Sequence, residues 1–297
     1  MTSPVISTVT STAGRIAGAP ISWGVCEVPG WGYQLPAGRV LSEMRGLGLT
    51  ATESGPDGYL PADPAERARL LDQYDLTAAG GFVPAVLHDP AIDPVIDVDR
   101  ALDGFGAEDP VLVLAAATGR DGYEGRPVLG RTGWRTLLAN LDRVAAHAAG
   151  RGFATTLHPH VGTMVETRDD VQAVLDGSTV QVCLDTGHLL IGGTDPAGLA
   201  SQVPHRIGHV HLKDVSLTVA RQVAGQRISY TEGVAAGLYR PLGHGDVNVA
   251  GVVAALEASG YQGWYVLEQD TILPAEPTGE GPVKDVRASL DYLRTLL

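Results

Sequence analysis

The sequence is poor in the residues that mark several large classes of protein. It contains two cysteines, Cys26 and Cys183, which lie far apart and outside any CxxC spacing, so neither a disulfide framework nor a structural zinc module is indicated. No apolar run approaches the ~20 residues of a membrane span. The first dozen residues lack the basic start and apolar stretch of a signal peptide. We therefore expect a cytoplasmic protein in a reducing compartment.

Positive charge is also scarce. The 297 residues include 21 Lys and Arg against 34 Asp and Glu, which gives a formal net charge of -13. Such a chain repels phosphate backbones and anionic membranes, so nucleic acid and membranes are not expected as partners. Only two of the basic residues are lysines, Lys213 and Lys284, which makes each of them worth examining.

Short apolar runs alternate with helical patterns along the whole chain, as is typical of βα units around a parallel sheet. Eight units in a chain of this length predict an α/β fold, a single-domain (β/α)8 TIM barrel. A doubly wound sheet is the alternative, but the first predicted strand ends in SWGVC and not in GxGxxG. The predicted strands cover 16–23, 50–54, 76–83, 110–116, 152–158, 180–185, 207–212 and 263–268, and the predicted helices cover 37–47, 64–74, 94–105, 132–150, 168–175, 196–203, 249–259 and 283–297.

Two segments are too long to be ordinary loops of such a barrel. We expect a loosely ordered tail over 1–14 and a barrel over 15–297, with the long segments at 215–248 and 270–282. Both would start at the carboxyl ends of strands, where TIM barrels build their active sites. We expect 215–248 to cover the mouth, with Arg240 or Tyr239 reaching toward the substrate or a neighbouring subunit.

Polar side chains lie at the carboxyl ends of the last four predicted strands. These ends are neighbours in a barrel, so His158, Asp185, His211 and Glu268 could converge on one point. Two imidazoles and two carboxylates suit Mn²⁺, Co²⁺, Fe²⁺ or Zn²⁺ better than Ca²⁺ or Mg²⁺. Two alternatives remain open: Asp185 could cap the next helix, and His160 could replace His158 as the ligand on the fifth strand.

Other polar residues near these strand ends are candidates for catalysis or substrate contacts. His188 could bind or protonate a substrate oxygen, or could be a solvated loop histidine. Lys213 could stabilise an enolate or act as a base, and we expect a nearby divalent cation to depress its pKa; it could instead pair with Asp214 or Glu268. The catalytic candidates are Lys213, His188 and Glu268, and the candidates for substrate contacts are Trp23, Glu53, His160, His209 and Arg240, although Trp23 could equally be a packing residue.

Several motifs in order resemble a known family. They are APISW at 19–23, LHPHVGT at 157–163, LDTGH at 184–188, HVHLKD at 209–214, PLGHGD at 241–246, and the run from Gly263-Trp264 to Glu268. Over about residues 17–270 the chain is similar to the xylose isomerase-like barrels, and among these to the inosose (2-keto-myo-inositol) dehydratases. The resemblance implies dependence on Mn²⁺ or Co²⁺. Some members are described as needing glutathione, but nothing in this sequence shows a site for it.

One departure from the wider family bears on the reaction. In most members of the wider family the fifth strand resembles one that ends in a Glu metal ligand. This chain has His158-Pro159-His160 there, which resembles the inosose dehydratases. Dehydration of a ketone needs a base, a cation that stabilises the enediolate and an acid for the leaving hydroxyl, and Glu268, His188 and Lys213 could divide these tasks. We expect a hydro-lyase acting on a cyclic polyhydroxy ketone, with 2-keto-myo-inositol (scyllo-inosose) as the first candidate. The alternatives are a sugar isomerase or epimerase, and a non-catalytic subunit of a hetero-oligomeric lyase. A homo-oligomer is expected.

Overall fold

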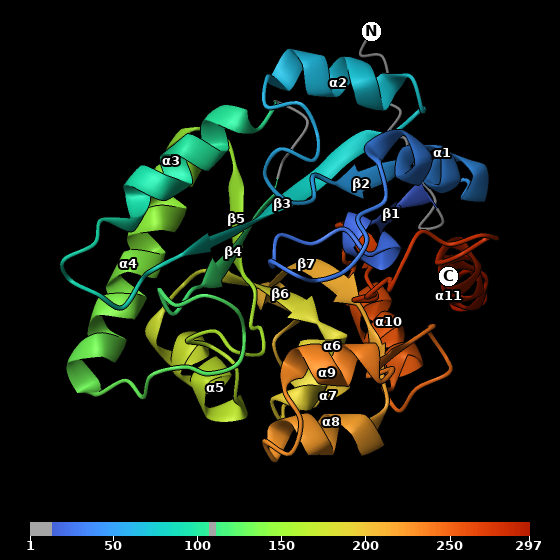
Figure 1. The fold of residues 1–297 in the computed structure, drawn as a ribbon. Coiled ribbons are helices and arrows are strands. Elements are labelled where there is room, and N and C mark those ends of the chain that lie inside the picture. Colours follow the sequence, from blue (N-terminus) through green and yellow to red (C-terminus); the bar gives the residue numbers. More distant parts are fainter. Residues whose placement is uncertain (1–13, 107–110) are drawn as a thin grey trace, which may run out of the picture.

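Eight parallel strands close into a barrel in the computed structural model, which describes residues 14–106 and 111–297. The strands follow one another around the barrel in chain order, and the first pairs with the last (Figure 1). The predicted single-domain (β/α)8 barrel is therefore confirmed. The barrel strands are β1 (Ile16–Gly18), β2 (Ala51–Glu53), β3 (Thr77–Ala85), β4 (Val111–Ala116), β5 (Ala154–Leu157), β6 (Gln181–Asp185), β7 (Ile207–Leu212) and β10 (Tyr265–Leu267).

Helices surround the barrel and connect its strands (Figure 1). Among the described residues, none of the helices combines the length and the apolar character needed to cross a membrane. The α-helices are α1 (Ala37–Leu47), α2 (Pro64–Asp72), α3 (Pro94–Gly104), α4 (Arg131–Gly150), α5 (Arg168–Gly177), α6 (Thr186–Ile191), α7 (Pro196–Gln202), α8 (Leu217–Ala224), α9 (Tyr230–Ala235), α10 (Val249–Ala258) and α11 (Val283–Arg294), and η2 (Pro20–Trp23) and η3 (Pro204–Arg206) are 3-10 helices.

Some elements differ from those predicted. The strand predicted over 16–23 ends at Gly18, because Pro20 has no N–H to donate to a ladder and begins η2 instead. Helix α6 was not predicted and follows β6 directly. The strand predicted over 110–116 is β4, of which residue 110 lies outside the described residues, as does the predicted tail apart from Gly14.

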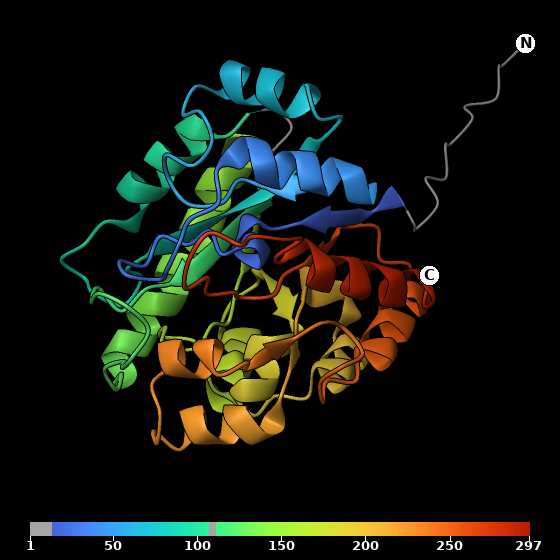
Figure 2. The ribbon, with the colours of Figure 1, turned by 45° about the vertical axis from the view of Figure 1, so that its right-hand side comes forward.

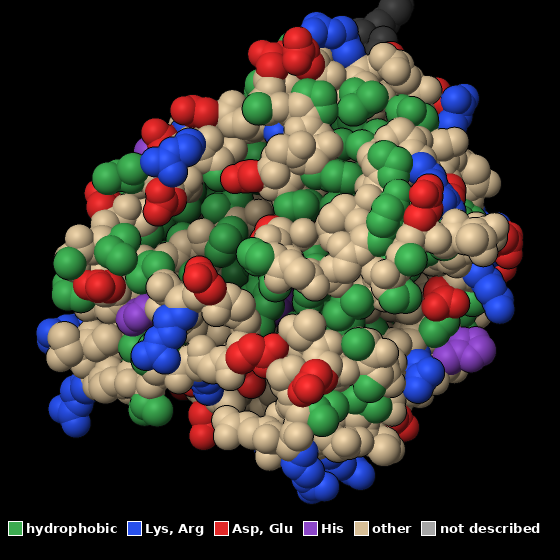
Figure 3. Space-filling view, in the orientation of Figure 1, with side chains coloured by type: hydrophobic (Ala, Val, Ile, Leu, Met, Phe, Trp, Pro, Cys, Tyr) green, Lys and Arg blue, Asp and Glu red, His purple; other side chains and the backbone are tan. Residues whose placement is uncertain are grey.

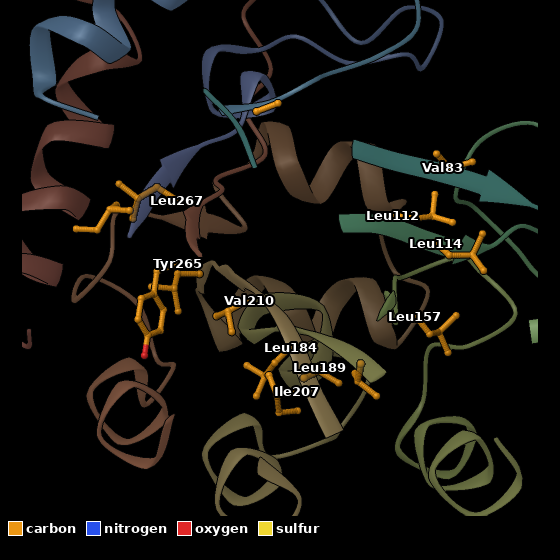
Figure 4. Close-up of a cluster of buried hydrophobic side chains, with 14 of the residues drawn as sticks. Val83, Leu112, Leu114, Leu157, Leu184, Leu189, Ile207, Val210, Tyr265 and Leu267 are labelled. Atoms are coloured by element: carbon orange, nitrogen blue, oxygen red, sulfur yellow. The ribbon is translucent and has the colours of Figure 1, made fainter. Parts of the chain in front are cut away.

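The main hydrophobic core lies between the strands and the helices around them. Leu112 and Leu114 on β4 and Leu184 on β6 are fully buried there (Figure 4). A separate small cluster joins four of the strands through Ala17, Ala51, Ala79 and Val266. Because side chains alternate along a strand, aliphatic residues point out to the helices and the inner positions at the carboxyl ends are left for polar side chains.

The long segment after β7 folds into regular structure. Strand β8 (Asp214–Val215) pairs antiparallel with β9 (Tyr239–Arg240), and α8 and α9 lie side by side between them (Figures 1 and 2). We call residues 216–238 the lid. Its buried Tyr230 and Val234 belong to a second hydrophobic cluster that includes Trp31. Figure 3 shows the face of the molecule that Figure 1 presents. Hydrophobic side chains line its hollowed middle, and Lys and Arg side chains lie mostly toward its rim.

Asp214 holds the turn that follows β9. Its buried carboxylate accepts hydrogen bonds from the backbone N–H groups of Val215, Gly243, Gly245 and Val247, at 2.9 to 3.0 Å. A Cβ on Gly245 would lie only 2.2 Å from Asp214 Oδ1, so the close approach of this turn requires glycine. The PLGHGD motif is thus a turn built around a carboxylate, which also fixes the end of the lid.

Replacement of Asp214 by Ala should destabilise the fold. Four N–H groups would lose a charged acceptor, and we expect the free energy of unfolding to fall by about 3 kcal/mol. The matched control is Asp246→Ala, because Asp246 accepts a single N–H, that of Leu217 at 2.7 Å, in an exposed position; its loss should cost less than about 1 kcal/mol. Urea denaturation measures both, and equal losses would contradict this role.

Candidate active site

Four ionisable side chains meet at the carboxyl ends of neighbouring barrel strands. His158 follows β5, Asp185 ends β6, His211 lies near the end of β7 and Glu268 follows β10. One ligand atom from each lies within 4.8 Å of the others. Asp185 Oδ2 is 3.2 Å from His158 Nε2 and 3.6 Å from His211 Nδ1, which also contacts Glu268 Oε2. We call these residues the four-residue cluster.

Asp185 uses its two oxygens for different purposes. Oδ1 accepts the N–H groups of Gly187 at 2.9 Å and His188 at 2.8 Å, and so caps α6. Oδ2 faces the cluster. For Asp185 the sequence left open a helix cap and a cluster carboxylate, and one side chain performs both functions.

The cluster contains polar atoms without hydrogen-bond partners. His158 Nδ1 is buried and makes no hydrogen bond. His211 Nδ1 and Glu268 Oε2 are also buried and have only an ion pair with one another and the more distant Asp185 Oδ2 as partners. Leaving such atoms unpaired is costly, and a bound cation at the cluster would compensate for that cost where it contacts them. Two imidazoles and two carboxylates form the donor set that borderline divalent metals prefer. The residues therefore fit a transition-metal ion.

Glu53 and His209 lie beside His211. Glu53 Oε1 accepts hydrogen bonds from His209 Nε2 at 2.8 Å and His211 Nε2 at 2.9 Å. If His211 donates through Nε2, its Nδ1 is free to face the cluster. Burial raises the pKa of Glu53, but the two imidazoles outweigh this and hold its pKa below the usual value. Both residues were expected to contact substrate, whereas Glu53 is used here to orient His211, as carboxylates do for metal-ligating histidines.

Lys213 is fully buried among carboxylates. Its Nζ lies 2.5 Å from Asp270 Oδ1, 3.4 Å from Glu268 Oε1 and 3.7 Å from Asp185 Oδ2. Burial lowers the pKa of Lys213, but these negative charges outweigh burial and hold the pKa well above its usual value. The expectation of a depressed pKa is corrected accordingly, because the sequence did not reveal how many anions surround the ammonium. Pairing with Asp214 is also excluded, since that carboxylate binds backbone N–H groups.

Two residues of this centre were missed in the sequence. Asp270 accepts the Lys213 ammonium through Oδ1 and the Tyr230 hydroxyl through Oδ2, both at 2.5 Å. Asp270 lies two residues after Glu268, and that spacing was an available signal. Tyr230 carried no such signal, because it reaches the barrel from the lid. Tyr239, which was named beside Arg240, shares a 2.9 Å hydrogen bond with Tyr230.

His188 and His160 stack beside Lys213. Their ring centroids are 3.7 Å apart, and Lys213 Nζ lies 3.1 Å from His188 Nε2. Burial, the facing imidazole of His160 and the Lys213 charge hold the pKa of His188 well below its usual value. His188 is thus a buried neutral imidazole and not a solvated loop residue. His160 makes a 2.7 Å hydrogen bond to the Val161 carbonyl and stacks on Tyr123 at 4.5 Å.

Two residues expected near the substrate lie elsewhere. Trp23 is fully buried in the main core, and its Nε1 donates to Glu43 at 2.8 Å. Its packing alternative is therefore the correct one. Arg240 is exposed, while its neighbour Tyr239 is buried with its hydroxyl 3.5 Å from His188 Nδ1. Because side chains alternate along β9, only Tyr239 can point inward.

A cavity of about 860 Å³ lies beside the lid, and no member of the four-residue cluster lines it. Residues 123–129 and 223–232 line it together with Val161 and Gly162. Tyr230 connects the cavity to the buried charges, because the same side chain donates to Asp270. The cavity is flanked by the lid, which is the arrangement expected of a covered active site.

Known proteins align with nearly the whole chain. An inosose dehydratase of Geobacillus thermodenitrificans (strain NG80-2) is 27% identical over 288 residues, which are 93% of this chain and 95% of that protein. The rhizopine catabolism protein MocC of Rhizobium meliloti is 32% identical over 266 residues, which are 86% of this chain and 81% of that protein. The resemblance to inosose dehydratases is thereby confirmed.

Solved structures and a family profile agree on the fold. An L-ribulose 3-epimerase superimposes with a TM-score of 0.66 at 15% identity, over 95% of this chain and 94% of that one. The probable 3-DHS dehydratase AsbF of Bacillus anthracis gives 0.65 at 15% identity, over 94% and 98%. The profile of the xylose isomerase-like TIM barrels matches residues 43–296. The chain belongs to the xylose isomerase-like TIM barrel family.

Proposed function

We propose that this protein is a metal-dependent hydro-lyase that dehydrates 2-keto-myo-inositol (scyllo-inosose). The observation that carries the proposal is the four-residue cluster with the Lys213 ammonium beside it, because the two together can stabilise an enediolate. Curated relatives that align with more than nine-tenths of the chain bear the name inosose dehydratase, which supports the choice of substrate.

The cation would be held by His158, Asp185, His211 and Glu268. Mn²⁺ or Co²⁺ is proposed first, and Zn²⁺ or Fe²⁺ would suit the same donors. When bound, such an ion supplies Lewis acidity toward the oxygens of the substrate. Glu53 keeps the His211 ring oriented, and the Asp185 cap ties the cluster to α6. These contacts fix the geometry of the ligands before any substrate arrives.

Lys213 and His188 are suited to opposite proton transfers. Three carboxylate oxygens keep Lys213 in its ammonium form, which is the charged donor available to the departing β-hydroxyl. His188 is a neutral imidazole 3.1 Å from that ammonium and can accept the α-proton of the ketone. This assignment reverses the roles suggested from the sequence, because the surroundings of Lys213 favour its charged form. Glu268 contacts both His211 and Lys213, so it would link the residues that hold the cation to the ammonium.

Product analysis tests the proposed reaction. Metal-free protein is reconstituted with Mn²⁺ or Co²⁺ and incubated with 2-keto-myo-inositol. We expect loss of one water and formation of an enolisable dione that absorbs in the ultraviolet. An isomeric ketose of unchanged mass would instead identify an isomerase or epimerase. Inactivity that a second polypeptide restores would identify a subunit of a larger lyase.

Asp185→Asn should remove the metal and leave the fold intact. The amide oxygen can still cap α6, but the anionic ligand is lost. Elemental analysis of the purified variant should find no stoichiometric metal, and the melting temperature should change little. Asp195→Asn is the matched control, because Asp195 caps α7 through an oxygen 3.1 Å from the Ala197 nitrogen on the surface. Full occupancy in Asp185→Asn would refute the proposed ligand set.

Lys213→Met and His188→Gln should each lose at least ~100-fold in turnover, as is typical when a general acid or base is removed. Metal content should stay the same in both. In deuterated water, Lys213→Met should still exchange the α-hydrogen of the substrate, because its base remains, whereas His188→Gln should lose exchange and elimination together. The opposite exchange pattern would return the base role to Lys213.

Tyr230→Phe tests the contribution of the lid. The variant keeps the ring but loses the hydroxyl that donates to Asp270, and we expect turnover to fall by about 10-fold, the equivalent of one hydrogen bond to a charged group. The control is Tyr265→Phe, since the buried Tyr265 donates in the same way to Glu257, at 2.7 Å, away from the four-residue cluster. Only stability should change in the control. Steady-state kinetics separates the two variants.

A further inference from the structure

A cysteine lies inside the barrel beside the four-residue cluster. Cys183 is on β6, two residues before Asp185, and is fully buried. Because side chains alternate along a strand, Cys183 and Asp185 point to the same side of β6. The two residues are paired in register with two successive inward residues of β7: Asp185 with His211, and Cys183 with His209. Cys183 therefore lies one step deeper in the barrel.

The sulfur of Cys183 has two histidines within reach. Cys183 Sγ and one ring nitrogen each of His158 and His211 lie within 4.8 Å of one another. Both histidines are about 99% buried. His158 Nδ1 has no hydrogen-bond partner, and His211 Nδ1 faces Glu268 Oε2 in an ion pair. A thiol and two imidazoles are ligands for soft and borderline ions, and a thiolate selects against hard ions.

The neighbouring groups of the same kind are held together by hydrogen bonds or through Lys213. Glu53, His209 and His211 are joined to one another by hydrogen bonds. His160, His188 and Asp270 surround the Lys213 ammonium, which contacts the last two. In the first of these groups His209 Nδ1 still makes no hydrogen bond. Among the described residues that could hold an ion near the centre, the group with Cys183 is distinguished by its sulfur ligand.

We propose that His158, Cys183 and His211 form a second, softer metal position that takes a thiophilic divalent ion such as Cd²⁺. It shares its two histidines with the four-residue cluster, so one ion at a time can occupy the pair of positions. Binding forms a bond from the ion to the sulfur, and the thiol proton leaves to the solvent. Cys183 itself lies up to about 6.6 Å deeper along the strand than Asp185, so an ion bound to its sulfur is drawn away from the carboxylates of the four-residue cluster.

This position gives the protein a chemical means of distinguishing metals. A hard or borderline ion such as Mn²⁺ gains two carboxylates by binding at the four-residue cluster, and a thiophilic ion gains a thiolate by binding deeper. A thiophilic ion would thus exclude Mn²⁺ without blocking the cavity. The two shared histidines belong to the proposed metal site, whereas neither the substrate nor the reaction affects binding of a thiophilic ion here.

Titration of metal-free protein with Cd²⁺ tests the second position. In the wild type we expect an ultraviolet sulfur-to-metal charge-transfer band that saturates at one ion per chain. Cys183→Ser should lose the band and bind Cd²⁺ at least ~10-fold more weakly, while its affinity for Mn²⁺ stays unchanged. Cys26→Ser is the matched control, because Cys26 is the other cysteine of the chain, and this variant should keep the band.

Two results would overturn the proposal: no charge-transfer band in the wild type, or an undiminished band in Cys183→Ser. X-ray absorption of the wild type with Cd²⁺ provides a measurement that needs no variant. A sulfur atom in the first coordination shell supports the proposal, and a shell of only nitrogen and oxygen refutes it. Because neither experiment includes 2-keto-myo-inositol, their failure is distinct from failure of the proposed dehydration.

Discussion

Compensation of buried negative charge is the constraint on which the centre of this protein depends. Glu53, Asp185, Glu268 and Asp270 bring four carboxylates to the end of the barrel, and Lys213 is the lysine among them. Uncompensated charge in a protein interior costs several kcal/mol for each ion, so histidines and Lys213 are drawn against these oxygens. A divalent cation at the four-residue cluster would remove much of the remaining imbalance, which links metal binding to the stability of the site.

The barrel and the four-residue cluster could both be predicted from the sequence, because both follow from the pattern of strands. Parallel strands of a barrel place their carboxyl ends at one face, so His158, Asp185, His211 and Glu268 could be brought together without knowing the register. The strand pattern did not show how deep in the barrel each side chain lies. Glu53 and Trp23 were candidates for substrate contacts, and Trp23 equally for packing, but the partner that each side chain takes depends on the atoms packed beside it.

Contacts made by the lid were even less accessible to prediction. Tyr230 is separated from Asp270 by forty residues, and no local pattern shows that the two side chains form a hydrogen bond. The charge state of Lys213 depends on the same long-range contacts, because Asp270 contributes the shortest of them. Residue type and strand position thus indicated which side chains take part, while the folded structure was needed to assign what each one does.

The attachment of the lid has a consequence for how the family could diversify. Residues 216–238 connect β8 to β9, and Val215 of β8 pairs directly with Tyr239 of β9. Asp214 accepts a hydrogen bond from Gly243 in the turn that follows β9. The ends of the segment are therefore adjacent, and a change in its length alters the loop-closure entropy only slightly. The lid is an exchangeable module: its sequence can be replaced to suit another substrate while the strands that hold the reacting groups keep their register.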